Sequence, residues 1–385
     1  MRFHAVFALF GLIVFTHESA ADPAGKGNAN SVSATAPSVS SDLWSYYESD
    51  QNPAYSVQPL FSAQLAQGAE AEQAQSEKCR RLKADIDADL GVVLRAGCKP
   101  TLAQMSKLMD NPLGNVAMDF NQIDFSRFKS DDTGKTANVT TYSNILQFPK
   151  GISENWNLIN RIVLTVPSLP LEQGKIDNFS GGTTGGLAPP GSAPAPIDVF
   201  GGRTTSLGDT YYVGLFSPKK GIKHDTGGTS VWGLGFDLAF PTAFEEILGS
   251  GRFSAGPSAL YAYLGPKWKI GGLLQHYWDY AGDDDRADVN TTNLQYFVYY
   301  SLDDTSSIGV GPNIICDWES DPGNNCTVPI GFGYNKTFQF GKVPVRFGGE
   351  IHYSIYRPED NPGAEWNFRF FVIPAVPSAL FKWLD

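Results

Sequence analysis

The segment KWKIGGLLQHYWD (Lys267–Asp279) decides the fold. Alternate positions form a mostly apolar face that includes Ile270, Gly272 and Leu274. The positions between them form a mostly polar face: Lys267, Lys269, Gly271, Leu273, Gln275 and Asp279. A period of two is that of a β-strand, because successive side chains of a strand point to opposite faces. We therefore predict a strand here, with His276 as an exception on the apolar face.

The same alternation recurs from Val116 onward, and in the third segment Asn160 interrupts the apolar face. Turn signals divide this region into about twelve segments. These begin near Asn115, Thr136, Asn155, Leu207, Ser230, Arg252, Lys267, Val289, Thr305, Asn325, Val343 and Glu365. An even number of antiparallel strands is typical of closed barrels in bacterial outer membranes. The sequence thus predicts an all-β fold, a transmembrane antiparallel β-barrel of about twelve strands.

The links between these segments alternate in length, with tight turns such as Gly265–Lys267 between loops such as Ala281–Asn290. Short turns on one rim and long loops on the other are typical of a transmembrane barrel, so we expect the long loops outside the cell. One longish link, Ser217–Gly228, falls on the short rim. A soluble sandwich is the alternative, because its strands also alternate. Tryptophans at predicted strand ends favour the barrel. They are Trp156, Trp268, Trp278, Trp318 and Trp366.

Charge and hydropathy exclude other classes of protein. The 385 residues contain 29 Lys+Arg and 40 Asp+Glu, a net charge of −11, which argues against nucleic acid as a partner. After the first 20 residues no apolar run reaches 18, so membrane-spanning helices are not expected. Charged residues make up 18% of the chain, and 40 glycines are present, which argues against a helical bundle.

The N-terminal third divides into three parts. Residues 1–21 have the order of a signal peptide, with Arg2, an apolar stretch and small residues before the cleavage point; a buried helix is the alternative, but its flanks lack capping signals. Residues 22–75 are a low-complexity segment that is expected to be flexible or weakly helical. Residues 76–110 are expected to form a helical hairpin whose second helix covers Leu102–Met109, acting either as a spacer or as a plug. Residues 111–385 are assigned to the barrel.

The four cysteines form two sequence-local pairs. An even count in an exported chain predicts the disulfides Cys79–Cys98 and Cys316–Cys326. The first would hold the helical hairpin together, and the second would close an outer loop. Neither pair has the spacing of zinc ligands, so no metal site is predicted.

Charged side chains on the polar faces of the strands are the candidate site. In a barrel this face lines the lumen, where charge is tolerated. The candidates for a solute pathway are Arg161, Lys267, Lys269, Arg346, Glu350 and Arg369. The alternative is that these residues pair across strands and only fill the interior, because about twelve strands leave a narrow bore.

Catalysis and cofactors are not predicted. Glu350, His352 and Ser354 alternate onto one face, but neighbouring positions on that face lie about 7 Å apart, too far for a hydrogen-bonded relay. No Gly-x-Ser-x-Gly turn is present. The acidic string Asp283–Asp288 lacks the glycine and ligand spacing of a calcium loop, and we expect a solvated loop or a bridge to lipid headgroups.

The stretch Asn155–Val372 resembles the outer-membrane family named for the MetA pathway of phenol degradation. The motifs that carry this resemblance are WNLINR (Trp156–Arg161), LGD (Leu207–Asp209), WGLG (Trp232–Gly235), SAGPSA (Ser254–Ala259), AGDDDRADVN (Ala281–Asn290), RPED (Arg357–Asp360) and EWNFRF (Glu365–Phe370), with NPLGNV (Asn111–Val116) as the opening. The N-terminal extension with its cysteines and the terminal Asp385 depart from the family pattern. The resemblance implies transport of small solutes, with aromatic or hydrophobic compounds as candidates.

Two functions are consistent with these observations. The first is an outer-membrane channel or transporter for small solutes, with membrane lipid as its surroundings. The alternative is an outer-membrane or periplasmic binding protein that holds a partner through its long acidic loops.

Overall fold

The computed structural model describes residues 72–85, 92–93, 96–129, 136–170, 202–225, 227–323, 325–341, 343–358 and 364–376. The chain divides into two units, Met1–Leu65 and Ala66–Asp385, and every described residue belongs to the second. The predicted signal peptide (1–21), nearly all of the predicted flexible segment (22–75) and the terminal Asp385 lie outside the described residues. None of the described helices has the length and hydropathy that a membrane span needs.

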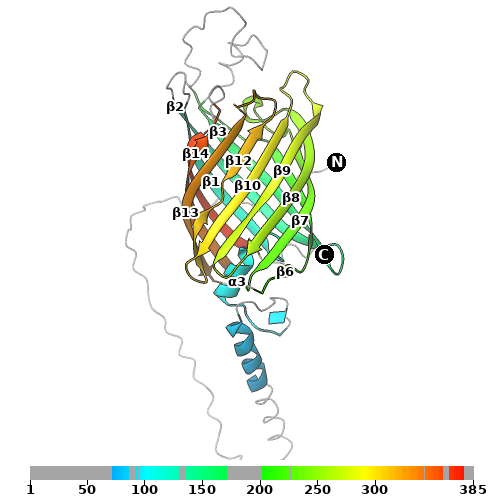
Figure 1. The fold of residues 1–385 in the computed structure, drawn as a ribbon, viewed down its shortest axis with the longest axis vertical. Coiled ribbons are helices and arrows are strands. Elements are labelled where there is room, and N and C mark those ends of the chain that lie inside the picture. The colour runs from blue at the N-terminus through cyan, green and yellow to red at the C-terminus, as the bar shows by residue number, and fades with distance from the viewer. Residues whose placement is uncertain are drawn as a thin grey trace, which may run out of the picture. The chain divides into compact units, whose positions relative to one another are not determined.

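A closed barrel of twelve antiparallel wall strands forms the body of the second unit (Figure 1). The wall consists of β1 (Ala117–Lys129), β2 (Thr136–Gly151), β3 (Trp156–Leu169), β5 (Thr210–Pro218), β7 (Thr229–Phe240), β8 (Arg252–Leu264), β9 (Trp268–Gly282), β10 (Asn290–Ser301), β11 (Ser306–Val310) with β12 (Asn313–Asp317), β13 (Cys326–Phe340), β14 (Val343–Tyr356) and β15 (Ala364–Val376). Each strand pairs with its sequence neighbour, and β1 pairs with β15 to close the ring. The predicted strand number is therefore confirmed, and each strand begins within three residues of its predicted start.

One wall strand is interrupted. β11 and β12 pair with β10 in a single continuous register, so they are two halves of one strand. Both also pair with β13, but the ladder skips the residues around Gly311 and Pro312. Proline has no backbone N–H to donate to a ladder, which fits an interruption at this point.

The links have two length classes, as predicted. At one end of the barrel the turns are short, such as the four residues between β10 and β11, where Asp303 accepts hydrogen bonds from the Ser306 hydroxyl (2.6 Å) and the Thr305 N–H (2.7 Å). These bonds hold the pKa of Asp303 below its usual range. The exceptional link Ser217–Gly228 contains β6 (Ile222–Lys223), which pairs with β7 (Thr229–Phe240) and so extends the hairpin. At the other end, β4 (Thr204–Thr205) pairs with β3, and η2 (Glu246–Leu248) lies in the loop after β7.

The outward face of the barrel is apolar. On β9, Ile270 and Leu274 are 45% and 44% exposed, whereas Leu273 between them is 3% exposed. The five tryptophans predicted to lie at strand ends are all exposed, between 38% and 51%. A protein in water would bury such a surface, and lipid is its favourable environment, so the soluble sandwich is not what this sequence forms.

The two predicted polar exceptions on this face have partners. The Tyr212 hydroxyl donates to Asn160 Oδ1 over 2.8 Å, and His276 Nδ1 lies 2.7 Å from Thr292 Oγ1. A further polar group, not predicted, lies on the outward side of β1 and β2. There the Asn144 amide donates to Asp119 Oδ1 over 2.6 Å. Asn160 and Asn144 thus have hydrogen-bonding partners on the lipid-facing wall, where an unpaired group would be costly, whereas His276 has a partner only at Nδ1 and its buried Nε2 has none among the described residues.

Both predicted disulfides are present. Cys79, in the helix at residues 72–84, is bonded to Cys98, and Cys316 on β12 is bonded to Cys326 on β13. Val93, Ala96 and Cys98 form a small buried cluster around the first bond. The second predicted helix is confirmed as α3 (Leu102–Met109). It begins with a capping box, in which Thr101 Oγ1 accepts from the Gln104 N–H and Gln104 Oε1 accepts from the Thr101 N–H.

Candidate functional site: the closed lumen

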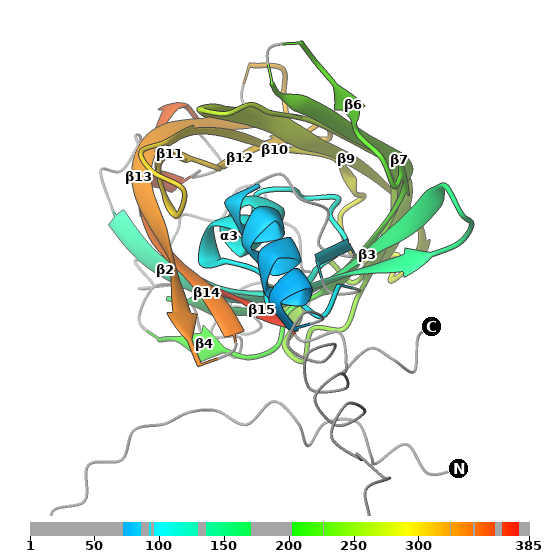
Figure 2. The same ribbon diagram turned by 90° about the horizontal axis from the view of Figure 1, so that it is seen from below.

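Helix α3 lies inside the short-turn end of the barrel, within the ring of strands (Figure 2). Its Ser106 hydroxyl is 3.1 Å from Thr337 Oγ1 on β13, and both side chains are buried. Arg346 on β14 donates from Nη2 to the Ser106 carbonyl over 2.9 Å. The helix is therefore attached to the wall by polar contacts.

Asp110, the residue that ends α3, is the strongest of these attachments. Its carboxylate lies 2.5 Å from Lys269 Nζ and 2.7 Å from Arg346 Nη2. The three side chains are between 9% and 15% exposed, so the charges are shielded from water. Removing one member of such a buried ionic group costs about 3–5 kcal/mol, because the others lose their compensation.

The segment that follows α3, residues 111–116, crosses the lumen and contacts further strands. Leu113 packs in a buried cluster with Ile159, Val213, Leu260 and other residues of the wall. Gln147 Nε2 on β2 donates to the Pro112 carbonyl over 3.0 Å, and Asn157 Nδ2 on β3 donates to Asn115 Oδ1 over 2.6 Å. We call residues 101–116 the plug segment, because they occupy the short-turn end of the lumen and contact the wall on several sides.

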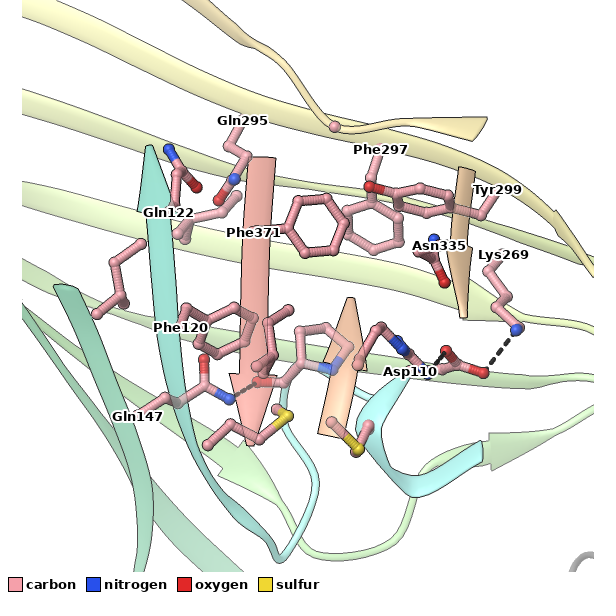
Figure 3. A pocket seen from close by; sticks show the side chains of 18 of the residues that line it. Asp110, Phe120, Gln122, Gln147, Lys269, Gln295, Phe297, Tyr299, Asn335 and Phe371 are labelled. Carbon is pink, nitrogen blue, oxygen red and sulfur yellow. Dashed lines mark hydrogen bonds and ion pairs between the residues drawn. The ribbon is translucent and has the colours of Figure 1, made fainter. Parts of the chain in front are cut away.

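A cavity of about 170 Å³ lies in the lumen beside the plug segment (Figure 3). Rings and thioethers give it an apolar part: Met109, Met118, Phe120, Phe297 and Phe371. Amides, a phenol and charged groups give it a polar part: Asp110, Gln122, Gln147, Arg161, Lys269, Gln295, Tyr299, Asn335, Arg346, Glu350 and Arg369. The cavity is thus amphipathic.

Glu350 is the centre of a buried network on one side of this cavity. Its carboxylate accepts hydrogen bonds from the Tyr299 hydroxyl (2.5 Å) and the Gly311 N–H (3.1 Å), and it lies 2.8 Å from His352 Nε2. Arg369 donates to the Gly311 carbonyl over 2.9 Å and pairs with Asp124 over 2.9 Å. Both backbone groups of Gly311, at the interruption of the wall strand, are therefore held by charged lumen side chains.

The ring nitrogens of His352 are both engaged by groups other than Ser354. Nε2 faces Glu350, and Nδ1 lies 3.2 Å from the Asn367 side chain. The Ser354 hydroxyl donates instead to the Ala364 carbonyl over 2.6 Å. Glu350, His352 and Ser354 therefore do not form the hydrogen-bonded Ser–His–acid relay of a hydrolase, because the serine hydroxyl is bonded elsewhere.

Five of the six predicted pathway residues line this one cavity. They are Arg161, Lys269, Arg346, Glu350 and Arg369. Lys267 does not: it is exposed in the turn before β9, and its ammonium lies 5.9 Å from the centre of the Tyr300 ring. The alternation of the strand begins at Trp268, so it could not be extended back to Lys267. The role of Lys267 in a solute pathway therefore stays a prediction, and it does not rest on this cavity.

The sequence left open that the charged lumen residues only pair with one another across strands. Three of them do form ion pairs, but with partners that the sequence did not indicate. Lys269 and Arg346 pair with Asp110 of the plug segment, and Arg369 pairs with Asp124 on β1. The only signal for Asp124 was its place on the inward face of a predicted strand. No sequence signal placed Asp110 in the lumen.

The acidic loop after β9 is folded back on the barrel rim. Arg252 Nη2 lies 2.9 Å from Asp288 Oδ1, and its Nη1 lies 3.7 Å from Asp284 Oδ1. Beside it, Asp209 accepts from both the N–H and the hydroxyl of Ser250. Within the described ranges, no group of three His, Cys, Asp or Glu side chains is placed to hold a metal ion. The acidic string is therefore partly neutralised by arginine.

No protein-family model and no curated protein matches the sequence, so the resemblance to the MetA-pathway family stays a prediction. Among solved structures, the chain is similar to a COG4313 outer membrane channel from Pseudomonas putida F1, with 12% identity, a TM-score of 0.46, and coverage of 68% of this chain and 96% of that one. It is also similar to outer membrane phospholipase A from Escherichia coli, with 11% identity, a TM-score of 0.38, and coverage of 71% of this chain and 96% of that one. A third similar structure is the P. putida toluene transporter TodX, with 8% identity, a TM-score of 0.30, and coverage of 72% of this chain and 93% of that one.

Proposed function

We propose that the protein is an outer-membrane channel for small solutes, whose lumen is closed by the plug segment and opens when that segment moves. The observation that supports this proposal most directly is the contact between the plug segment and the wall. It includes an ionic group at Asp110 and a hydroxyl pair at Ser106 and Thr337, in addition to apolar packing. Water can replace the polar contacts when the segment leaves, because it can hydrogen-bond to the same groups.

The location follows from the wall. A closed barrel satisfies all of its backbone hydrogen bonds, and an apolar outer face suits lipid, which together are the requirements for a strand-built membrane protein. Barrels of this kind with short turns on one rim belong to bacterial outer membranes. The charged and amphipathic lumen suits a path for small polar or amphipathic solutes.

The test is conductance of the full-length protein in planar lipid bilayers. Asp110→Asn leaves Lys269 and Arg346 without their anion, so we expect this variant to open more often than wild type, with larger ion currents. Asp304→Asn removes the same charge from an exposed position in the turn between β10 and β11, and it should behave as wild type.

A second variant closes the channel. Ser106→Cys combined with Thr337→Cys places two thiols where two hydroxyl oxygens are 3.1 Å apart, so oxidation should lock the plug segment and suppress the current. Reduction should restore it, with reduced wild type as the control for the native disulfides. If neither wild type nor Asp110→Asn conducts ions or passes sugars in liposome swelling, the channel proposal fails, and binding through the loops becomes the better explanation.

A further inference from the structure

Arg161 differs from the other basic residues of the lumen cavity. Lys269, Arg346 and Arg369 each have a carboxylate within 2.9 Å. Among the described residues, no carboxylate lies within 4 Å of the Arg161 guanidinium. Its hydrogen bond from Nη2 goes to the neutral Gln295 Oε1, over 3.3 Å.

A count of the charged side chains around the cavity also indicates that Arg161 lacks a carboxylate partner. Four basic and two acidic side chains line it, and a third acid, Asp124, pairs with Arg369 beside it. Among these four basic and three acidic side chains, Arg161 is the basic one that is left without a carboxylate partner. A guanidinium removed from water is costly without an anion, and its fork of N–H donors fits a carboxylate with two parallel hydrogen bonds. The cavity therefore has an open position for one monoanion.

The apolar side chains of the cavity determine which group the anion carries beside its charge. Phe120 on β1, Phe297 on β10 and Phe371 on β15 direct their rings into the same space (Figure 3). Offset and edge-to-face contacts with phenyl rings favour an aromatic ligand over an aliphatic one. A volume of about 170 Å³ is below the roughly 300–1,000 Å³ of pockets for drug-sized ligands, so a single ring is the size that fits.

We propose that this cavity binds small aromatic monocarboxylates, with the carboxylate on Arg161 and Gln295 and the ring against the phenylalanines. Asp110 and Glu350 line the same cavity, so a dianion such as phosphate would meet repulsion that a single carboxylate largely avoids. The inference rests on the proposed function, because it identifies the class of solute that pauses in the closed lumen. Binding is non-covalent.

The experiment is calorimetric titration of the full-length protein in detergent with two probes, sodium benzoate and benzyl alcohol, which share a ring and differ in charge. Wild type should bind benzoate more tightly by about 10–100-fold, the equivalent of a charge-assisted hydrogen-bonded pair. Arg161→Gln should bind the two probes alike. Lys267→Gln removes one positive charge outside the lumen and should keep the wild-type preference.

Arg161→Lys provides a second variant that keeps the charge and loses the planar fork, and we expect an intermediate preference. The shift between heated and unheated gel samples verifies that each variant is a folded barrel. Equal binding of the two probes by wild type, no binding of benzoate, or an unchanged preference in folded Arg161→Gln or Arg161→Lys would overturn the proposal. If Arg161→Gln does not fold, the wild-type comparison and Arg161→Lys decide.

Conductance of the same samples without benzoate separates the two proposals. A barrel that conducts but shows no preference for benzoate disproves only the carboxylate site. A barrel that binds benzoate through Arg161 but never conducts disproves the channel and retains the site.

Discussion

Glu350 shows how a single side chain can hold the wall of this barrel. It is 4% exposed, and it accepts hydrogen bonds from the Tyr299 hydroxyl on β10 and from the Gly311 N–H between β11 and β12. Its own strand, β14, is separated from β10 by β11, β12 and β13 in the ring. The carboxylate therefore connects parts of the wall that do not pair with each other.

Replacing Glu350 tests this connection. Glu350→Leu leaves the Tyr299 hydroxyl and the Gly311 N–H buried without an acceptor, which should lower the free energy of unfolding by about 2–6 kcal/mol. Glu350→Gln keeps an acceptor oxygen in the same place and should cost clearly less. Urea unfolding of the protein in lipid vesicles measures both. Equal losses for the two variants would show that the hydrogen bonds at this position contribute little.

At the same scale, the sequence could predict where the charged side chains point but not which partners they meet. Strand alternation was sufficient to place Arg161, Lys269 and Arg369 on the inward face, because it has a fixed period. Their partners depend on long-range structure: Asp124 belongs to a strand more than 200 residues away from Arg369, and Asp110 precedes the first strand. Lys267 lies in the turn before β9, where the period of the strand does not determine the direction of the side chain.

Each wall strand has one face toward lipid and the other toward the lumen, and β9 is a clear example. Leu274 faces outward and Leu273 faces a buried cluster on the inside. Because the side-chain period is two, neighbouring leucines have opposite surroundings. The same substitution at the two positions should therefore have different effects.

Leu274→Arg should destabilise the barrel by roughly 2–4 kcal/mol if it lies near the membrane midplane, and less toward either interface. Leu274→Ala should cost less, because the leucine contacts lipid and its removal leaves no cavity. Leu273→Ala should cost about 2–5 kcal/mol, since it removes a packed side chain from the interior. Folding titrations in vesicles measure all three. A harmless Leu274→Arg would place this residue away from lipid.

Strand and helix boundaries were predictable because turn residues and periodicity mark them locally, as at α3 and at the start of β14. The interruption between β11 and β12 was not predicted, although Gly311-Pro312 is a typical breaker dipeptide. The pattern on both sides of it continues in one register, so the sequence reads as one strand. Only the hydrogen bonds of Gly311 to Glu350 and Arg369 reveal that the backbone is held by the lumen at this point.

At the scale of the whole molecule, the position of the plug segment inside the barrel could not be predicted. The sequence left residues 76–110 as a spacer or a plug, because a helix of eight residues can pack in many places and its pattern names no partner. Its position inside the barrel depends on contacts with residues that lie 159 and 240 positions farther along the chain, through Asp110 to Lys269 and through Ser106 to Arg346. Such contacts leave no local signature in a single sequence.

The orientation of the barrel follows from the same arrangement. The plug segment lies at the short-turn end, where β1 also begins and β15 ends. Outer-membrane barrels have their short turns in the periplasm and their long loops outside the cell. The plug segment would then close the channel from the periplasmic side, which leaves the cavity to be reached from the outside.

Epitope tags test this orientation. A tag inserted after Asp285 or after Gly323 lies in a long loop, so antibodies should bind it on intact cells. A tag inserted after Asp304 lies in a short turn and should be reached only after the outer membrane is opened. The three insertions are exposed to a similar degree, so accessibility reports the side of the membrane and not local burial. The reverse pattern would place the plug segment at the outer surface, and the channel would then be closed against solutes arriving from the medium.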